Sequence, residues 1–212
     1  VARVLGAEAR EIVWTSGATE ANNLALLGAA RAPAYAGKRH LVTVVSEHRS
    51  VLDPLFALER EGFTLTRLPV DCTGLVDLER LAAALRPDTL LVSVMHANNE
   101  LGVLQPIRAI GRLCKQRGVL FHCDATQSFG KEELDVERDG IDLLSASAHK
   151  LHGPPGAGLL FVRHRRPHVR LAPLFHGGGH ERGMRSGTLN VPALVGFGAA
   201  AELALAERTA DR

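Results

Sequence analysis

The stretch SASAHKLHGPPGAG, residues 145–158, places one lysine, Lys150, directly behind an apolar run at 141–146 that is typical of a buried strand. Lysine is rarely buried for packing alone, so an amine held at a strand end is a candidate reagent. The Gly-Pro-Pro-Gly link is too short for a helical crossover to the next apolar run, 158–162. We therefore expect that run to form a strand that is antiparallel or lies at a bend.

Apolar runs alternate with stretches of helical period along the rest of the chain. Runs rich in Val, Ile and Leu predict strands at 11–14, 41–45, 64–68, 90–95, 119–123 and 143–146. Helical periodicity predicts helices at 19–30, 51–61, 78–85, 107–117 and 192–206. This alternation predicts an α/β three-layer sandwich, in which a mainly parallel sheet is covered by helices on both faces.

The composition restricts the class of protein. Hydrophobic residues make up 46% and charged residues 23% of the 212 residues, as in a globular protein with one substantial core. The net charge of +2 is spread along the chain and no apolar run could span a bilayer, so we expect neither nucleic acid nor membrane as a partner. Three cysteines, Cys72, Cys114 and Cys123, lack disulfide-framework or zinc-ribbon spacing, which favours a reducing, cytoplasmic compartment.

Polar clusters follow the predicted strands, at the point where each strand ends. They read TSGATE at 15–20, SEHRS at 46–50, HANNE at 96–100, DATQ at 124–127 and SAHK at 147–150. Ligands of open α/β sheets bind beyond the carboxyl ends of the strands. The sequence therefore predicts that these clusters converge on one site.

TSGATEANN, residues 15–23, has a glycine turn that opens a helix, where free amide N–H groups and the positive dipole end favour an anion such as phosphate. The alternative is that Thr15 or Ser16 merely caps the helix, with Glu20 in its first turn. This stretch taken alone favours the cap.

FHCDATQ, residues 121–127, places Asp124 at the end of a buried strand, where a carboxylate needs a positive group. The candidates are a metal shared with His122, two residues back on the same strand face, and the protonated ring nitrogen of a cofactor. A carboxylate that caps the next helix is about equally compatible with this stretch.

Two later motifs are basic. HGGGHERGMRSGT, residues 176–188, has too many glycines for the helix of a zinc-binding histidine pair. We expect a flexible loop there that binds an anion or covers a substrate, with Arg182 and Arg185 as charge donors. RHRRPHVR, residues 163–170, has no interleaved aromatic residues and predicts a solvated loop.

A lysine amine, an acid for a ring nitrogen, a phosphate cradle and a histidine at strand ends together describe a pocket for pyridoxal 5'-phosphate. In this interpretation Lys150 forms the Schiff base and Asp124 keeps the pyridine nitrogen protonated. No metal is expected in such a site.

The motifs TSGATEANNLA, SEHRSVLD, VSVMHANNELGVLQPI, HCDATQSFGK, SASAHKLHGPPGAGLLFVR and HGGGHERGMRSGT closely resemble the cysteine desulfurases of the class V aminotransferase family. The resemblance covers nearly the whole chain and is strongest to the group that donates sulfur for iron-sulfur clusters. It implies the large domain of fold-type I enzymes, which has a mostly parallel seven-stranded sheet.

The resemblance also implies roles for individual residues. Lys150 would be the cofactor lysine, and Asp124 would pair with the pyridinium. His48 would stack on the ring, Gln127 would bond its phenolic oxygen, and Asn99 would lie near that oxygen and the substrate carboxylate. The phosphate would be held by Ala18, Thr19, Ser147 and His149, and by Thr188 from the neighbouring subunit of a homodimer.

The implied reaction converts L-cysteine into alanine and an enzyme persulfide that passes to a sulfur-acceptor or scaffold protein, with Lys150 and His48 available for proton transfers. Its nucleophilic thiol lies on a later loop in the family, and none of the three cysteines here is at that position. We therefore expect residues 1–212 to be the cofactor-binding large domain, without the family's opening segment and its carboxyl-terminal small domain.

Two alternatives remain open from the sequence. The same pocket would serve a selenocysteine lyase or another class V lyase or aminotransferase. A non-catalytic scaffold could keep the fold to bind a sulfur-transfer partner, but it would have no physical need for Lys150, Asp124 and His48 around one cavity.

Overall fold

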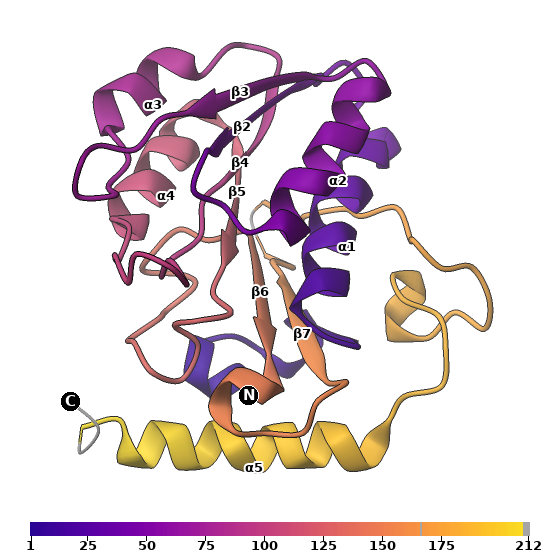
Figure 1. The fold of residues 1–212 in the computed structure, drawn as a ribbon. Helices are drawn as coiled ribbons and strands as arrows, with labels where there is room; N and C mark the ends of the chain where they lie inside the picture. The colour runs from indigo at the N-terminus through magenta and orange to yellow at the C-terminus, as the bar shows by residue number, and fades with distance from the viewer. Residues whose placement is uncertain (166, 210–212) are drawn as a thin grey trace.

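A computed structural model describes residues 1–165 and 167–209 (Figure 1), and its elements follow the predicted alternation. The strands are β1 (Ile12–Thr15), β2 (His40–Val44), β3 (Thr64–Leu68), β4 (Thr89–Ser93), β5 (Leu120–Asp124), β6 (Leu143–Ser147) and β7 (Gly158–Val162). The α-helices are α1 (Ala18–Arg31), α2 (Arg49–Arg60), α3 (Leu78–Ala84), α4 (Ile107–Arg117) and α5 (Val191–Glu207). Short 3-10 helices lie at η1 (Ala2–Leu5), η2 (Ala9–Glu11), η3 (Pro33–Tyr35), η4 (Ala148–Leu151) and η5 (Glu181–Gly183).

All seven strands form one sheet in the order β1-β7-β6-β5-β4-β2-β3. Neighbours from β6 to β3 are parallel, as strands joined by helical crossovers must be, and β7 is antiparallel to both β6 and β1. The expectation for the strand after the Gly-Pro link is therefore confirmed.

Helices cover both faces of the sheet and produce two apolar cores, which confirms the three-layer α/β sandwich. Residues of α1 and α2 pack on one face around Leu24, Leu55 and Leu91, and residues of α4 and α5 pack on the other around Phe121 and Phe197. Figure 1 shows α1 and α2 on one side of the sheet, α3 and α4 on the other, and α5 across the end, near η4.

The alternating pleat of β5 divides its side chains between the two faces. Phe121 and Cys123 pack into the core under α4, whereas Leu120 packs into the core under α1 and α2. His122 and Asp124 point the same way as Leu120, so the strand delivers Asp124 to the end of the sheet that α1 and α2 border.

The basic run 163–170 is not entirely the solvated loop that was predicted. Arg163 is buried and pairs with Asp142 and Glu137, because it lies where β7 ends beside the start of β6. Arg166 lies outside the described residues.

Within the described residues, no helix combines the length and the apolar character needed to cross a bilayer. The three cysteines are all unpaired, with Cys72 exposed and Cys114 and Cys123 buried.

Candidate active site

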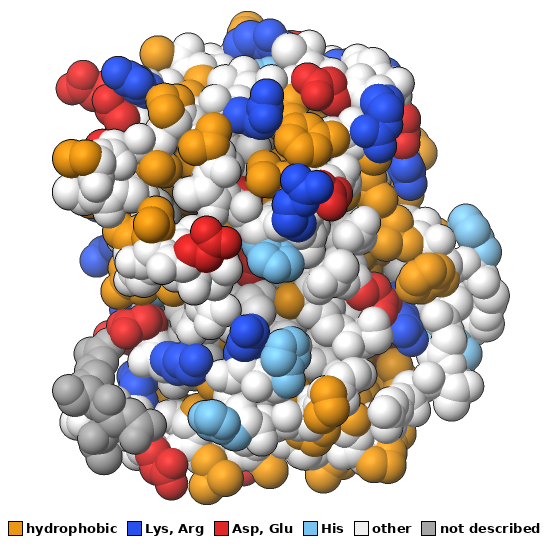
Figure 2. All heavy atoms as spheres, in the orientation of Figure 1, with side chains coloured by type: hydrophobic (Ala, Val, Ile, Leu, Met, Phe, Trp, Pro, Cys, Tyr) orange, Lys and Arg blue, Asp and Glu red, His pale blue; other side chains and the backbone are white. Residues whose placement is uncertain are grey.

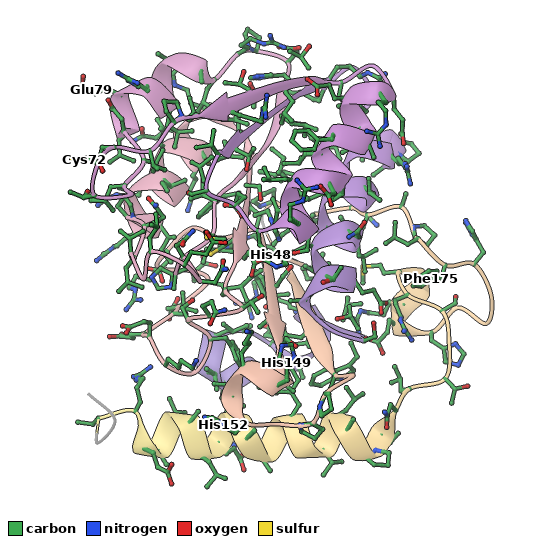
Figure 3. The ribbon with its side chains drawn as sticks, viewed as in Figure 1. His48, Cys72, Glu79, His149, His152 and Phe175 are labelled. Carbon is green, nitrogen blue, oxygen red and sulfur yellow. The ribbon has the colours of Figure 1, made fainter. Side chains whose placement is uncertain are left out.

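The carboxyl ends of the strands surround a cavity of about 550 Å³. Its wall takes residues from every polar cluster that the sequence placed at a strand end, so the predicted convergence is confirmed. In Figure 2 two histidine side chains flank a hollow in the middle of this face, and Figure 3 identifies them in the same orientation as His48 and His149.

Most of the predicted site residues lie on the wall of this cavity. They are Ala18, Thr19, His48, Asn99, Asp124, Gln127, His149 and Lys150. Ser147 lies just behind the wall at the end of β6, where its Oγ is 2.7 Å from Nδ1 of His149. Thr188 is exposed between η5 and α5 and is not part of the wall, and its predicted contact with a neighbouring subunit stays a prediction.

Lys150 reaches the cavity from η4, the single helical turn that follows β6. The side chain is half-buried, and among residues 1–165 and 167–209 no side chain forms a hydrogen bond or an ion pair with its amine. A lysine held at a cavity wall without an acidic partner can serve as a nucleophile.

The turn before α1 is held by backbone packing rather than by a capping side chain. The N-cap is Gly17, and neither Thr15 nor Ser16 caps the helix, so the alternative interpretation of this stretch was wrong. A Cβ at Gly158 would lie 2.5 Å from Cα of Gly17, which means that only glycine at the start of β7 lets this turn approach. The first N–H groups of α1 therefore remain available to an anion beside Ser147.

Asp124 is oriented by donors from two directions. Its Oδ1 accepts hydrogen bonds from the backbone N–H and the hydroxyl of Thr126, and its Oδ2 accepts one from Nδ2 of Asn22 at 2.8 Å. In the described structure no helix lies between β5 and β6, so the alternative that Asp124 caps the next helix was wrong; the carboxylate holds a turn with Thr126 and borders the cavity.

The metal interpretation of His122 is not supported. Both ring nitrogens are engaged, Nδ1 with Ser93 at 2.8 Å and Nε2 with Ser145 at 3.1 Å. Complete burial lowers the pKa of His122, and the charge of Asp124 opposes that effect only in part. No group of three potential metal-binding side chains is found in the described part of the chain.

Glu47 is a functional candidate that the sequence analysis missed. Its side chain is buried behind the cavity wall, where Oε1 accepts a hydrogen bond from the N–H of Met95 and Oε2 has no partner in the described structure. Burial, reinforced by the charge of Asp124, raises the pKa of Glu47 well above its usual range, which favours the neutral carboxyl. The available signal was its position next to His48, in the polar cluster that follows an apolar strand.

The two arginines of the 176–188 loop have structural partners rather than the predicted role as anion donors. Arg185 pairs with Glu20 at 2.7 Å, and Arg182 donates to the carbonyl of Ile12. Burial alone would raise the pKa of Glu20, but hydrogen bonds from Arg185 and Ser16 lower it. These contacts tie the loop to β1 and α1.

None of the cysteines lines the cavity. Burial raises the pKa of Cys114 to about 12 and that of Cys123 well above its usual value, so neither provides a thiolate at neutral pH. Cys72 is exposed, but Figure 3 shows it at the edge of the molecule, far from His48 and His149.

A family model described as Aminotransferase class-V matches residues 1–211. The chain belongs to the class-V aminotransferase family. Curated relatives include a protein named cysteine desulfurase IscS from Anaeromyxobacter sp. (strain Fw109-5), which is 61% identical over 211 residues, covering 100% of this chain and 52% of that protein. A protein of the same name from Haemophilus influenzae (strain PittGG) is 56% identical with the same coverage.

Solved structures of this family have the same fold. A structure titled "SspA in complex with cysteine" is 46% identical and superposes with a TM-score of 0.90, covering 95% of this chain and 58% of that one. With 52% of each curated relative covered, this chain spans about half the length of the proteins that it matches.

Proposed function

We propose that this chain is the cofactor-binding domain of a pyridoxal phosphate-dependent cysteine desulfurase. The observation that carries the proposal is that Lys150 and Asp124, from the ends of neighbouring strands, border the same cavity. The high identity to proteins named cysteine desulfurase supports this reaction over the other class V activities.

The residues present fit the cofactor. The uncapped start of α1, with Ala18 and Thr19, suits its phosphate, and Ser147 and His149 lie beside that turn. Asp124 has its donors on the protein side and borders the cavity, which suits a protonated ring nitrogen.

The remaining wall residues fit the rest of the cofactor ring. His48 projects from the start of α2 at the opposite side of the cavity from His149, where it would cover the ring face. Gln127 and Asn99 would bond the ring oxygen, and Asn99 would also lie near the substrate carboxylate. When bound, pyridoxal phosphate supplies an electron sink for negative charge that develops on the substrate.

The protein's own groups would then position the reactants and move protons. Lys150 would hold the cofactor covalently and, once displaced by substrate, would carry protons at its Nζ. Asp124 would keep a proton on the ring nitrogen. The raised pKa of Glu47 favours its neutral form, which would avoid a second negative charge beside Asp124.

L-Cysteine is the proposed substrate, supported by the family member whose structure is titled as a complex with cysteine. The products would be alanine and a persulfide. We propose that the accepting thiol lies outside these 212 residues, because Cys114 and Cys123 are buried and Cys72 is far from the cavity.

The wider setting follows from the same proposal. The persulfide sulfur would pass to an acceptor or scaffold protein of iron-sulfur cluster assembly or another sulfur-transfer pathway. The enzyme would act in the cytoplasm as a homodimer in which Thr188 reaches the neighbouring subunit's phosphate. The unpaired cysteines support a reducing compartment.

The test is to incubate the chain with pyridoxal phosphate, reduce it with borohydride, and map the modified peptide by mass spectrometry. We expect one phosphopyridoxyl group, on Lys150. Lys150→Arg should lose this modification, whereas Lys131→Arg, at an exposed site outside the cavity wall, should keep it. Absence of the adduct on a folded chain would contradict the proposal and favour a non-catalytic scaffold.

A further inference from the structure

His48 has a second role, as the N-cap of α2. The backbone N–H of Ser50 donates to Nδ1 of His48 at 3.1 Å, and the Ser50 hydroxyl lies 2.8 Å from the same nitrogen. A backbone N–H can only donate, so Nδ1 must be an acceptor and cannot carry the ring proton. In a neutral imidazole the proton is then on Nε2.

The hydroxyl of Ser50 is itself given a direction by Asn22. Nδ2 of Asn22 donates to Oγ of Ser50 at 2.8 Å, which leaves the serine hydrogen free to donate to His48. The second hydrogen of the same Nδ2 donates to Oδ2 of Asp124, also at 2.8 Å. One buried amide therefore connects Asp124 to the Ser50 hydroxyl that contacts His48.

The burial of this bridge makes it a fixed feature rather than a surface contact. Asn22 is fully buried, Ser50 is 9% exposed and Asp124 is 5% exposed. Hydrogen bonds in such surroundings are stronger than in water, which favours one fixed arrangement of donors and acceptors. His48 is exposed to the open cavity, and the described residues provide no hydrogen-bond partner for its Nε2.

We propose that Asn22 and Ser50 are positioning residues that hold His48 in the Nε2–H tautomer and couple its orientation to that of Asp124. His48 thus presents a hydrogen-bond donor to whatever occupies the cavity. To accept a proton there through Nε2 it must first move its own proton to Nδ1, which breaks the cap contact with the Ser50 N–H. This inference deepens the proposed function and rests on it for its catalytic meaning.

The test reads the tautomer directly and needs no cofactor. The chain is labelled with ¹⁵N-histidine, and two-bond ¹H–¹⁵N correlations are recorded above the titration range of imidazole, where the protonated and bare nitrogens have well-separated shifts. His48→Gln assigns the signal. We expect wild-type His48 to carry its proton on Nε2; a proton on Nδ1, or an averaged signal, would overturn the proposal.

Variants then test the bridge. Ser50→Ala removes one of two hydrogen bonds to Nδ1, so the ratio of Nε2–H to Nδ1–H should fall roughly two- to ten-fold. Asn22→Ala should lower it in the same direction, and Ser50→Thr, which keeps the hydroxyl, should restore it. Asn23→Ala is the matched control, because within the described residues the Asn23 side chain donates to the carbonyl of Thr19 and makes no contact with the bridge.

The buried ring of His122 provides an internal check on folding, since both its nitrogens are engaged away from the bridge. An unchanged His48 tautomer ratio in Ser50→Ala with intact His122 signals would overturn the role of Ser50. Loss of the His122 signals means that the variant has not folded. The proposal is then tested by the tautomer of wild-type His48 and by the tautomer ratio of Ser50→Thr. Borohydride trapping at Lys150 is independent of these spectra, so failure of the proposed function and failure of this inference are distinguishable.

Discussion

In the described part of the chain, buried carboxyl groups have an ion-pair partner at the amino end of the central strands and none at the carboxyl end. At the amino end of β6, Asp142 accepts a hydrogen bond from the N–H of Phe121 and pairs with Arg163 at 3.0 Å. Arg163 also donates to the carbonyls of Val136 and Ile141, so nearly every polar atom is satisfied. At the carboxyl end, Glu47 and Asp124 have no ion pair within the described structure.

The atoms without partners concentrate at the carboxyl end. Oε2 of Glu47 and Oδ1 of Asn22 are buried without a hydrogen bond, and both residues contact or adjoin the cavity lining. Buried polar groups are normally paired, so groups left unsatisfied mark a place where stability is given up for binding. The amino end serves the fold, and the carboxyl end serves a ligand.

The largest expected effect on stability comes from removing the buried ion pair at the amino end of β6. Arg163→Met leaves Asp142 as an uncompensated buried charge, and the free energy of unfolding should fall by about 3–5 kcal/mol in urea titrations. Arg165→Met is the matched control, because Arg165 pairs with Glu8 while 66% exposed, and should cost under about 1 kcal/mol. Equal losses in the two variants would refute the contrast between a buried and an exposed pair.

The next largest effect is expected where the turn before α1 packs against Gly158, at the carboxyl end of the sheet. Gly158→Ala forces a Cβ against Gly17, so the free energy of unfolding should fall by about 1–3 kcal/mol and trapping of pyridoxal phosphate should weaken. Gly198→Ala in α5 meets open space and should instead stabilise the chain by about 0.5–1 kcal/mol. A harmless Gly158→Ala would mean that the turn before α1 does not need this close approach.

The third effect, which is small within any one pH unit, depends on pH and concerns Glu47. Because its pKa is raised in the folded state, folded Glu47 keeps a proton that the unfolded chain loses as the pH rises above 4.5. Wild-type stability should therefore fall in this range by up to about 1.4 kcal/mol per pH unit relative to Glu47→Gln, which cannot ionise. Chemical unfolding of both proteins at several pH values measures this difference.

Glu79→Gln is the control for that series, because Glu79 is exposed in the first turn of α3. Any pH dependence of its difference from wild type is the baseline against which Glu47→Gln is compared. If Glu47→Gln shows the same pH dependence as Glu79→Gln, burial does not raise the pKa of Glu47 in the folded chain.

Local pattern was sufficient for the elements and for most of the cavity wall. The predicted strands and helices match those observed to within about two residues, because burial alternates with the period of each element. Asp124 and Lys150 were recognisable because they lie at or shortly after the ends of apolar strands, and the carboxyl ends of parallel strands meet; the role of His48 came from the family resemblance.

The failures concern side chains whose partners are distant in sequence. Arg185 was expected to bind an anion, but it pairs with Glu20, 165 residues away. The sequence left His122 as a possible metal ligand. In the structure its two ring nitrogens form hydrogen bonds with Ser93 and Ser145, on the two neighbouring strands. Such contacts depend on register and strand order, which no local window contains.

The sequence by itself therefore determined the α/β alternation and most of the residues that meet at the sheet edge, and it left the last strand as either antiparallel or lying at a bend. Those properties follow from periodicity and chain length, which are local. Only the tertiary structure decided that Glu47 is a buried acid with a raised pKa and that Asn22 and Ser50 connect Asp124 to His48. Desolvation and hydrogen-bond direction depend on the atoms that surround a group, and those atoms are brought together only by folding.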